Sequence, residues 1–335
     1  MIKLIHMNFY LEQLQRFDEA IKSANEIAIF THVSPDGDAL GSSLAIFKVI
    51  KDHYKKNVTI FISDKIPKIY EFLPCLDCYK NTDDPHFENK IFDLAIATDV
   101  ANCERMGKAL PLYKKSKIKI NIDHHKSNNN YGDINIINSQ ASSASEVVLD
   151  ILTDLKITLT KEIATFIYVG ILTDTGGFRY DNTKQEVLEK AAKLLNYGIS
   201  HSELCQKCFM TKEKKALLLT ANAILNAKFL LCDKIAYTTI TLNDMKKYNA
   251  KNEHTDRIVE TLRQLETCDV ALLFKENINQ TTKVSLRSKI FDVSNFASKF
   301  GGGGHKFAAG LTIQKPINIA MDLVLSELSK VMKDD

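Results

Sequence analysis

Short apolar runs rich in Ile, Val and Phe alternate with longer amphipathic segments through the first two hundred residues. Runs at 26–32, 58–63, 93–99 and 118–123 have the length and composition of buried strands. Segments at 39–52, 143–155, 161–173 and 184–196 repeat apolar residues every three or four positions, which predicts helices. A capping-box pattern, Ser200 to Glu203, opens a further helix. This alternation predicts an α/β domain built on a parallel sheet.

The pattern changes after residue 211. Residues 212–228 contain no turn-forming residue and predict a linker helix. Beyond it we expect strands at 235–241, 269–275 and 281–288, helices at 253–266, 292–300 and 316–332, and a glycine loop followed by a short strand. This mixed order predicts a smaller α+β domain. The expected organisation is a first domain over 1–200, linker helices over 201–233 and a second domain over 234–335.

Composition narrows the class of protein. The 335 residues are 45% hydrophobic and 25% charged with a net charge of +3, which is typical of soluble globular chains. This balance argues against a disordered chain and against a duplex DNA binder that works by bulk positive charge. No apolar stretch reaches the length of roughly 20 residues that spans a bilayer, and the N-terminus lacks a secretory signal pattern. We expect a cytoplasmic protein without a membrane partner; its oligomeric state stays open, a homodimer included.

Seven cysteines include two CxxC pairs, Cys75 with Cys78 and Cys205 with Cys208. Each pair has the spacing of half a zinc site. The pairs lie 127 positions apart (205 minus 78) and lack the turn glycines of zinc ribbons. An odd number of cysteines in a long chain fits free thiols in a reducing compartment. We therefore favour ordinary thiols over a zinc site.

Metal-ligating residue types follow the predicted strands. His32 ends the first, Asp99 the third, and Asp123, His124 and His125 the fourth. Ligands of open α/β sheets bind outside the carboxyl ends of the strands, so these side chains are expected at one edge. Two loops add carboxylates: Asp36 and Asp38 flank a glycine after the first strand, and Asp174 follows an apolar helix.

Each of these residues also has a purely structural interpretation. Asp36 and Asp99 can cap the following helices, adjacent histidines occur by chance, and Asp174 can simply end a helix before a Gly-Gly turn. It is improbable that every one of these structural interpretations is correct when all of the residues lie at one sheet edge. Five carboxylates and three histidines suit two divalent cations, with Mn²⁺ favoured and Mg²⁺ or Fe²⁺ as alternatives. Two ions about 4 Å apart activate a bridging water and neutralise a phosphoryl group, so the chemistry predicted is phosphoester hydrolysis.

A second candidate region lies in the C-terminal domain. Four successive glycines let a backbone approach a ligand closely, although such runs are more often flexible loops. Arg287 taken alone is more often a solvated strand residue than a phosphate ligand. Local positive charge from Lys289, Lys299 and Lys306 favours an anion site in this domain. The candidate substrate-binding residues are Arg287, Gly301, Gly302, Gly303, Gly304 and His305.

Taken together, these motifs resemble the DHH phosphoesterase superfamily, and more closely its two-domain nanoRNase and 3′-phosphoadenosine 5′-phosphate (pAp) phosphatase members. The resemblance rests on HVSPDGDALG at 32–41, the Asp99 strand end, DHH at 123–125, TDTGGF at 173–178 and GGGGHKFAAG at 301–310. It covers about 20 to 330 with every motif in family order. It implies a DHH domain and a DHH-associated domain that face each other across a cleft holding two Mn²⁺ ions.

The resemblance also implies roles for single residues. One ion would be held by His32, Asp36 and Asp99, and the other by Asp38, Asp99, His124 and Asp174, with Asp99 bridging. Asp123 would orient the imidazoles and His125 would stabilise charge on the scissile phosphate. Arg287 and the glycines with His305 would bind substrate phosphate or base. Many relatives have Asn where this chain has Ser34; this position is not a ligand, so only local loop hydrogen bonding is affected.

The leading functional hypothesis is a manganese-dependent hydrolase of very short RNA oligonucleotides, of pAp, or of both. Its partners would be these small phosphorylated nucleotides, and its products mononucleotides or AMP. One alternative is a phosphodiesterase for cyclic dinucleotides or their linear products. A non-enzymatic alternative is a metal-dependent nucleotide-binding module, although no ligand position is lost. An exonuclease acting on long single strands would need extra nucleic-acid-binding domains with aromatic stacking platforms, and a family II pyrophosphatase would not explain the glycine motif.

Overall fold

The computed structural model describes residues 2–255 and 257–332, without the side chains of residues 2–8 and 305. The chain divides into two compact units, Met1–Thr211 and Lys212–Asp335. The segment expected as linker, 201–233, is therefore shared between the two units. The cleft expected between the two units stays a prediction. No described helix combines the length and apolar character that crossing a membrane requires.

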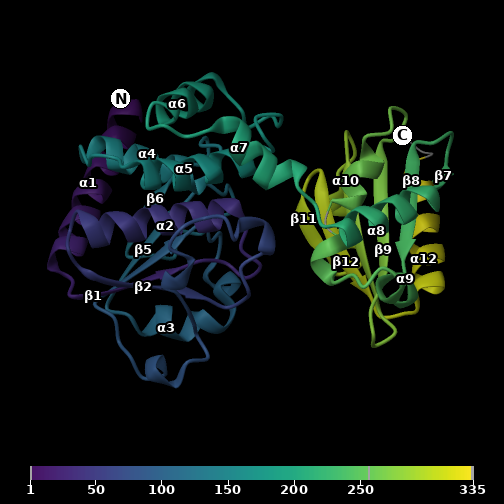
Figure 1. Cartoon of the computed structure of the whole chain (residues 1–335), viewed down its shortest axis with the longest axis horizontal. Helices are drawn as coiled ribbons and strands as arrows, with labels where there is room; N and C mark the ends of the chain where they lie inside the picture. Colours follow the sequence, from purple (N-terminus) through teal and green to yellow (C-terminus); the bar gives the residue numbers. More distant parts are fainter. Residues whose placement is uncertain (1, 256, 333–335) are drawn as a thin grey trace. The chain divides into compact units, whose positions relative to one another are not determined.

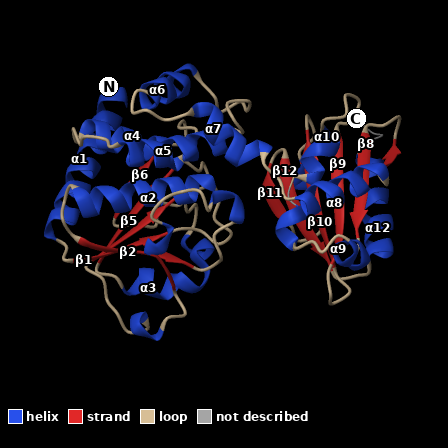
Figure 2. Ribbon diagram, viewed as in Figure 1, coloured by secondary structure: helices blue, strands red, loops and turns tan. Residues whose placement is uncertain are grey.

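The first unit is built on a parallel sheet of six described strands in the order β3-β2-β1-β4-β5-β6. Figure 2 shows strands of this sheet in red with helices around them. The four expected strands are present, which confirms the predicted parallel α/β fold. β3 and β6 were not predicted because they are only three and four residues long and lie at the sheet edges. The strand bounds are β1 Glu26–Phe30, β2 Asn57–Ile62, β3 Tyr79–Asn81, β4 Leu94–Thr98, β5 Ile118–Asp123 and β6 Ile134–Ile137.

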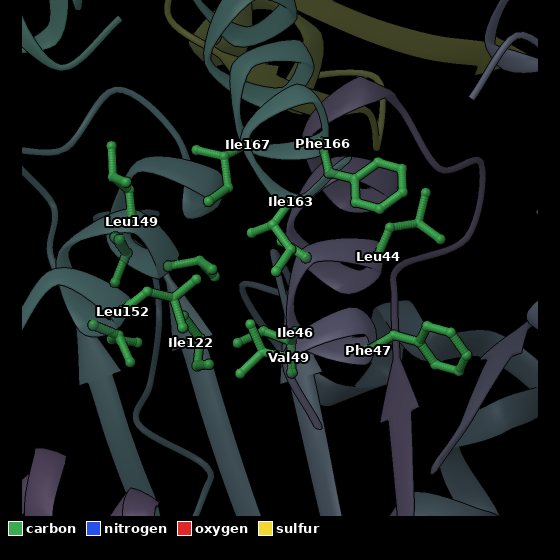
Figure 3. Close-up of a cluster of buried hydrophobic side chains, with 14 of the residues drawn as sticks. Leu44, Ile46, Phe47, Val49, Ile122, Leu149, Leu152, Ile163, Phe166 and Ile167 are labelled. Atoms are coloured by element: carbon green, nitrogen blue, oxygen red, sulfur yellow. The ribbon is translucent and has the colours of Figure 1, made fainter. Parts of the chain in front are cut away.

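Helices cover both faces of this sheet (Figure 1). One face carries α1, α2, α4 and α5, whose apolar side chains pack with alternate strand residues into the main core (Figure 3). The other strand residues pack against α3 and the 3₁₀ helix Cys103–Ala109. Removing this apolar area from water, at about 25 cal/mol per Å², stabilises the layers. The helix bounds are α1 Ile2–Ser23, α2 Gly37–Asp52, α3 Leu110–Lys115, α4 Ala144–Asp154, α5 Lys161–Asp174, α6 Gln185–Leu195 and α7 His201–Cys205.

The second unit is a mixed sheet in the order β11-β12-β10-β9-β8-β7, in which β8 and β9 are parallel and the other pairs antiparallel. Helices α11 and α12 pack on one face, and α8 and α10 on the other. The bounds are β7 Lys228–Leu230, β8 Ile235–Ile240, β9 Val270–Glu276, β10 Thr282–Ser288, β11 Gly303–His305, β12 Ala308–Ile313, α8 Lys214–Leu225, α9 Leu242–Lys247, α10 Ile258–Arg263, α11 Val293–Ser298 and α12 Ile317–Val331.

Two predictions in the second unit are wrong in detail. The expected helix over 253–266 is broken: a 3₁₀ turn, Asn252–Thr255, precedes Arg257, whose φ of 67° is left-handed, and only Ile258–Arg263 is α-helical. The glycine loop is not wholly irregular, because residues 303–305 form edge strand β11. Glycine has low strand propensity, so pairing with β12 decides this conformation rather than local preference.

Candidate metal centre and anion-binding face

The three strands with metal-ligating residues at their ends are neighbours in the first sheet. Strands β1, β4 and β5 pair consecutively and in parallel, so their carboxyl ends meet at one edge. His32 lies two residues beyond β1, Asp99 directly follows β4, and Asp123 is the last residue of β5 before His124 and His125. The edge predicted from the strand ends is therefore formed.

Asp99 occupies the centre of this edge in an unusual backbone conformation. Its φ of 60° lies in the left-handed region, which Asp tolerates better than most residues. Its N–H donates to the carbonyl of Ile122 at 3.0 Å, which continues the pairing of β4 with β5. The side chain is 3% exposed, and its Oδ1 is buried without a hydrogen-bond partner among the described residues. A buried, unpaired carboxylate oxygen is costly, and a bound cation is the kind of partner that would satisfy it.

The loop after β1 presents two carboxylates in a tight turn. The Asp36 carboxylate accepts the N–H groups of Asp38 and Ala39 at 3.0 and 3.1 Å, so it caps α2. The same side chain lies 3.9 Å from Nε2 of His32, so capping and a ligand position coexist in one residue. Gly37 is required here because a Cβ would lie 2.4 Å from the side chain of Thr173 on α5.

Asp38 joins this loop to α4. Its two carboxylate oxygens accept the N–H groups of Ala144 and Ser145 at 2.6 and 2.8 Å, at the N-terminus of that helix. This position is favourable because unpaired N–H groups and the helix dipole attract negative charge. Asp174 is the last residue of α5 and precedes a turn in which Gly176 and Gly177 both have positive φ.

The ligand atoms of the candidate residues form three overlapping groups, each within 4.8 Å. Nε2 of His32 is 3.3 Å from Asp99, and Nε2 of His124 is 3.6 Å from both Asp99 and Asp174. The groups are His32, Asp36 and Asp99; Asp38, His124 and Asp174; and Asp99, Asp123, His124 and His125. The predicted metal residues are thus brought together, while their assignment to individual ions stays a prediction.

Hydrogen bonds orient the imidazoles as metal ligation requires. Nδ1 of His32 lies 2.7 Å from the carbonyl of Val33, which can only accept, so Nδ1 carries the proton and Nε2 presents a lone pair. The His124 imidazole forms a hydrogen bond with the backbone of Ala141, while its Nε2 faces the carboxylates. Such outer contacts normally fix the tautomer of metal-binding histidines.

Asp123 serves His125 rather than the centre of the edge. The Asp123 side chain is fully buried, with Oδ1 2.7 Å from Nδ1 of His125. Its Oδ2 accepts from the amide of Asn128 at 2.6 Å. Sequence reasoning missed Asn128, which lies in the polar run after the DHH motif and has no spacing signal. The carboxylate and amide together hold the His125 ring in one orientation.

The pKa values at this edge respond to burial and to the surrounding negative charge. Burial and the neighbouring Asp36 raise the pKa of Asp38 to about 6. Burial, followed by the charges of other carboxylates, raises the pKa of Asp99 and Asp174 well above the usual range. Burial lowers the pKa of His124 to about 4. Burial alone would also lower the pKa of His125, but Asp123 outweighs it and raises the value.

These observations fit divalent cations. The carboxylates share an edge where their negative charges disfavour one another, two imidazoles present Nε2 towards them, and Oδ1 of Asp99 has no hydrogen-bond partner in the described part of the chain. A cation would remove each of these costs at once. Mixed nitrogen and oxygen donors without thiolate suit Mn²⁺, Mg²⁺ or Fe²⁺.

Other metal-ligating residue types do not form comparable sites within the described part of the chain. No close group of potential ligands includes a cysteine there, and burial raises the pKa of Cys78 to about 12, which disfavours the thiolate that zinc needs. A group in the second unit combines Glu213, Glu253 and His254. The N–H of Lys251 donates to Nδ1 of His254, so Nε2 carries the proton and faces the carboxylates as a donor.

In the second unit, Arg287 is held on β10 by a carboxylate. Its Nε donates to Oε1 of Glu260 on α10 at 2.8 Å, and its Nη1 donates to the carbonyl of Leu286 at 2.9 Å. Both side chains are 28% exposed and line a pocket of about 190 Å³. Sequence reasoning missed Glu260, because the helix that carries it meets β10 only in the folded domain. Arg287 is thus oriented towards this pocket, on the same face of the sheet as α10.

The glycine run forms the edge of the same sheet. Gly301 and Gly304 have φ of 72° and 149°, conformations that favour glycine. Gly302 lies so close to β12 that a Cβ would be 2.4 Å from the carbonyl of Gly310, whereas Gly301 and Gly303 have open space around them. The side chain of His305 lies outside the described residues. The register pairs Arg287 with Ala308, and Ala308 with residue 305, so these positions share one face.

The lysines expected to supply positive charge differ from those at the pocket. Lys289 donates to the carbonyls of Leu265 and Glu266, so it holds a loop. The pocket is lined instead by Lys275, Lys283 and Arg257, together with Arg287. Alternation along β10 places Lys283 on the face of Arg287, but the partner residue on β9 depends on strand register, which is not readable from the sequence.

Residues 26–171 match the DHH family, N-terminal domain, and residues 233–334 match the DHHA1 domain. The chain is 32% identical to the Bifunctional oligoribonuclease and PAP phosphatase NrnA of Thermus thermophilus, over 91% of this chain and 90% of that protein. It is 28% identical to the protein of the same name from Bacillus subtilis, over 92% and 95%.

A solved structure agrees over the same length. An exopolyphosphatase-related protein from Bacteroides fragilis superposes with a TM-score of 0.89 at 25% identity, over 96% of this chain and 98% of that one. Both units are therefore shared with a solved structure, and both sequence families are present in the order expected from the motifs.

Proposed function

The chain belongs to the DHH family of phosphoesterases, and on this premise we propose that it is a manganese-dependent hydrolase of short RNA oligonucleotides and pAp. Family membership makes it a phosphoric ester hydrolase that depends on divalent metal. The substrates are proposed from the names of its relatives, which are similar over nine tenths of the chain. The manganese preference is proposed from the mixed imidazole and carboxylate donors.

The observation that carries this proposal is the shared edge of β1, β4 and β5. His32, Asp36 and Asp99 would hold one cation, and Asp38, Asp99, His124 and Asp174 the other. Two divalent cations bound there supply an activated water and neutralise charge on the reacting phosphoryl group.

The remaining candidate residues would contact the substrate, or orient a residue that does, rather than hold the cations. Asp123 accepts a hydrogen bond from Nδ1 of His125 and raises the pKa of that imidazole, which favours the doubly protonated ring, so Nε2–H would donate to the phosphate as its charge develops. In the second unit, Arg287 and glycines 301–304 would bind a phosphate or base of the substrate, because the Arg287 side chain is oriented by Glu260 and the glycine backbone is open.

A substrate panel tests this function. Purified protein is stripped with EDTA, reloaded with Mn²⁺, Mg²⁺ or Fe²⁺, and given pAp, RNAs of two to five nucleotides labelled at either end, linear and cyclic di-AMP, and long single-stranded RNA. We expect turnover of pAp and of the shortest RNAs, greatest with Mn²⁺, and none after stripping. Equal or greater turnover of cyclic di-AMP or long RNA would contradict the proposal, and the preferred label gives the direction of attack.

Metal binding has a readout that does not need turnover. Binding to the folded state alone stabilises it by about 2.7 kcal/mol at a hundred times Kd. For a domain of this size such a gain raises Tm by roughly 5 to 10 °C. We expect this shift on adding Mn²⁺ to the stripped protein and its reversal by EDTA; no shift up to millimolar Mn²⁺ would contradict the metal centre.

A further inference from the structure

Residues 141–145 form a short segment that supports two side chains of one candidate ligand group. Two N–H groups at the N-terminus of α4 donate to the Asp38 carboxylate, and the backbone of Ala141 forms a hydrogen bond with the His124 imidazole. Both side chains belong to the group that is completed by Asp174. The segment therefore positions two of the three members of this group directly.

Asp174, the third member, comes from a different part of the chain. It is the last residue of α5, where the helix carbonyls have no acceptor role within the helix and need other donors. The preceding carbonyl, of Thr173, accepts the backbone N–H of Gly176 at 3.0 Å. The Asp174 carbonyl accepts from a side chain instead, because Nδ2 of Asn182 lies 3.2 Å from it. Asn182 therefore holds the end of α5 from which the Asp174 side chain projects.

Asn182 also contacts the segment 141–145. Its Nδ2 donates to the carbonyl of Ser142 at 3.0 Å. Both partners of the amide are carbonyl oxygens, which can only accept, so the nitrogen and not the oxygen has to face them. The two bonds fix this orientation although Oδ1 of Asn182 is buried without a hydrogen-bond partner in the described part of the chain. The amide thus links Asp174 to the segment that positions the other two members of the group.

A second contact attaches the same loop to the neighbourhood of this segment. Nζ of Lys184 donates to the carbonyl and to the side chain of Gln140 at 3.3 and 3.0 Å. These bonds are exposed to solvent and involve neither Asp174 nor Ser142. Attachment of the loop and positioning of Asp174 can therefore be separated by substitution.

We propose that Asn182 is a positioning residue of the metal centre, which holds Asp174 in place to ligate one cation together with Asp38 and His124. The inference rests on the proposed function, which supplies the cation. Without the amide, the end of α5 loses its link to the segment that carries the other ligands, so this cation is bound more weakly. The other cation keeps its ligands, so its affinity stays the same.

Titration with Mn²⁺ tests this role without turnover. Metal-free wild type and N182A are titrated with Mn²⁺, and the free ion is measured by electron paramagnetic resonance. We expect two bound ions in the wild type. In N182A one ion should bind as in the wild type and the other about tenfold more weakly, as is typical when a contact outside the ligand shell is lost. The matched control is K184Q, which removes the bonds of the same loop to Gln140 and should bind both ions as the wild type does.

A double-variant cycle separates positioning of Asp174 from general support of the fold. D174N removes the charge of the ligand itself. If Asn182 acts through Asp174, adding N182A to D174N should weaken Mn²⁺ binding by less than about twofold further. A merely structural role would lower the metal-free Tm of N182A and leave both Mn²⁺ affinities unchanged. N182S, whose single hydroxyl donates to one carbonyl at a time, is the milder variant if N182A does not fold, and its affinity should lie between the two.

The outcomes separate the role of Asn182 from the function on which it rests. Wild-type affinity for both ions in N182A or N182S, or effects of N182A and D174N that add in full, would overturn the role and leave the metal centre intact. An equal loss of affinity in K184Q would also overturn it, because attachment of the loop would then explain the effect. If the wild type binds no Mn²⁺ at millimolar concentration, the metal centre of the proposed function fails, and the role of Asn182 fails with it.

Discussion

The two units carry opposite charge in opposite settings. The edge of the first sheet is acidic and buried, with Asp38, Asp99 and Asp123 each no more than 3% exposed. The pocket face of the second sheet is basic and open, with Lys283 exposed and Arg287 partly so. The first region fits resident cations, whereas in the second Arg287 is already paired with Glu260, and we propose that it binds the anionic substrate. The comparison teaches that three properties of a group of like-charged side chains indicate the kind of ligand it binds. They are the sign of the charge, the burial of the side chains and the rigidity of the backbone that carries them.

The two regions also differ in rigidity: the acidic edge is held more firmly than the basic face. The acidic edge is held by backbone hydrogen bonds to Asp38 and by the left-handed Asp99 at the end of a buried strand. The basic face depends on long side chains that water can reach. Substitutions at the edge should therefore act on kcat, and substitutions on the face should act on KM.

The largest expected effect comes from D99N. Asparagine keeps the shape of the side chain and tolerates the positive φ, but it removes the charge that faces both His32 and His124. We expect kcat with pAp to fall at least about a thousandfold. Without metal, Tm should rise, because one of several mutually repelling buried carboxylates is lost. Loss of activity with unchanged metal-free Tm would break the view that the edge is strained without cations.

A control for D99N is D52N, which removes an exposed carboxylate at the end of α2 in the same unit. We expect D52N to keep wild-type turnover. A D99N protein that retained more than a tenth of wild-type turnover would remove Asp99 from the metal centre.

The next effect is expected from D123N, which keeps the ring position of His125 but removes the charge beside it. Outer residues of this kind typically contribute 10- to 100-fold. Because Asp123 raises the pKa of His125, its loss should lower that pKa, so the deficit should grow as pH rises through the neutral range. The pH dependence of kcat/KM measures this. N128A keeps the Asp123 carboxylate but removes its amide partner, together with the bonds of Asn128 to Asn121, Val100 and Asn130, so a smaller deficit in turnover is expected there.

On the basic face, E260Q and R287A should raise KM with little change in kcat. The amide in E260Q still reaches Arg287 but holds it less firmly, so we expect KM for pAp to rise roughly threefold, and about tenfold in R287A. R263A serves as a control, since Arg263 donates to the carbonyl of Ser288 and does not line the pocket. A fall in kcat with constant KM would contradict the assignment of catalysis to the acidic edge and of substrate binding to the basic face.

The smallest effect concerns the loop before the acidic edge. Ser34 has a φ of 54°, and its N–H donates to Asp64 at 2.7 Å. Asparagine tolerates this conformation better, so S34N should stabilise the protein by about 0.5 to 1 kcal/mol, measured by denaturant unfolding, without changing turnover. S34A keeps the backbone cost and loses a hydroxyl 3.4 Å from Asp64, so little change is expected. Equal effects of both variants would contradict a backbone origin.

Prediction from the sequence succeeded where local signals and position along the chain agree. The apolar strands at 26–32, 93–99 and 118–123 end in polar residues, so the parallel fold and the members of the acidic edge were readable in advance. The short strands β3 and β6 carried too few residues for a pattern. The prediction of a helix over 253–266 was wrong because the apolar spacing continues across Arg257, where the backbone adopts a left-handed conformation.

The sequence by itself determined which residues are candidates for the chemistry: carboxylates and imidazoles that directly follow buried strands, and an arginine and glycines in the smaller domain. Only the tertiary structure decided that β1, β4 and β5 are neighbours, that Asp38 meets the N-terminus of α4, and that Lys275 lies opposite Lys283. The reason is physical. Residue type and burial pattern are local properties of the chain, whereas strand order and register are set by packing between segments far apart in sequence.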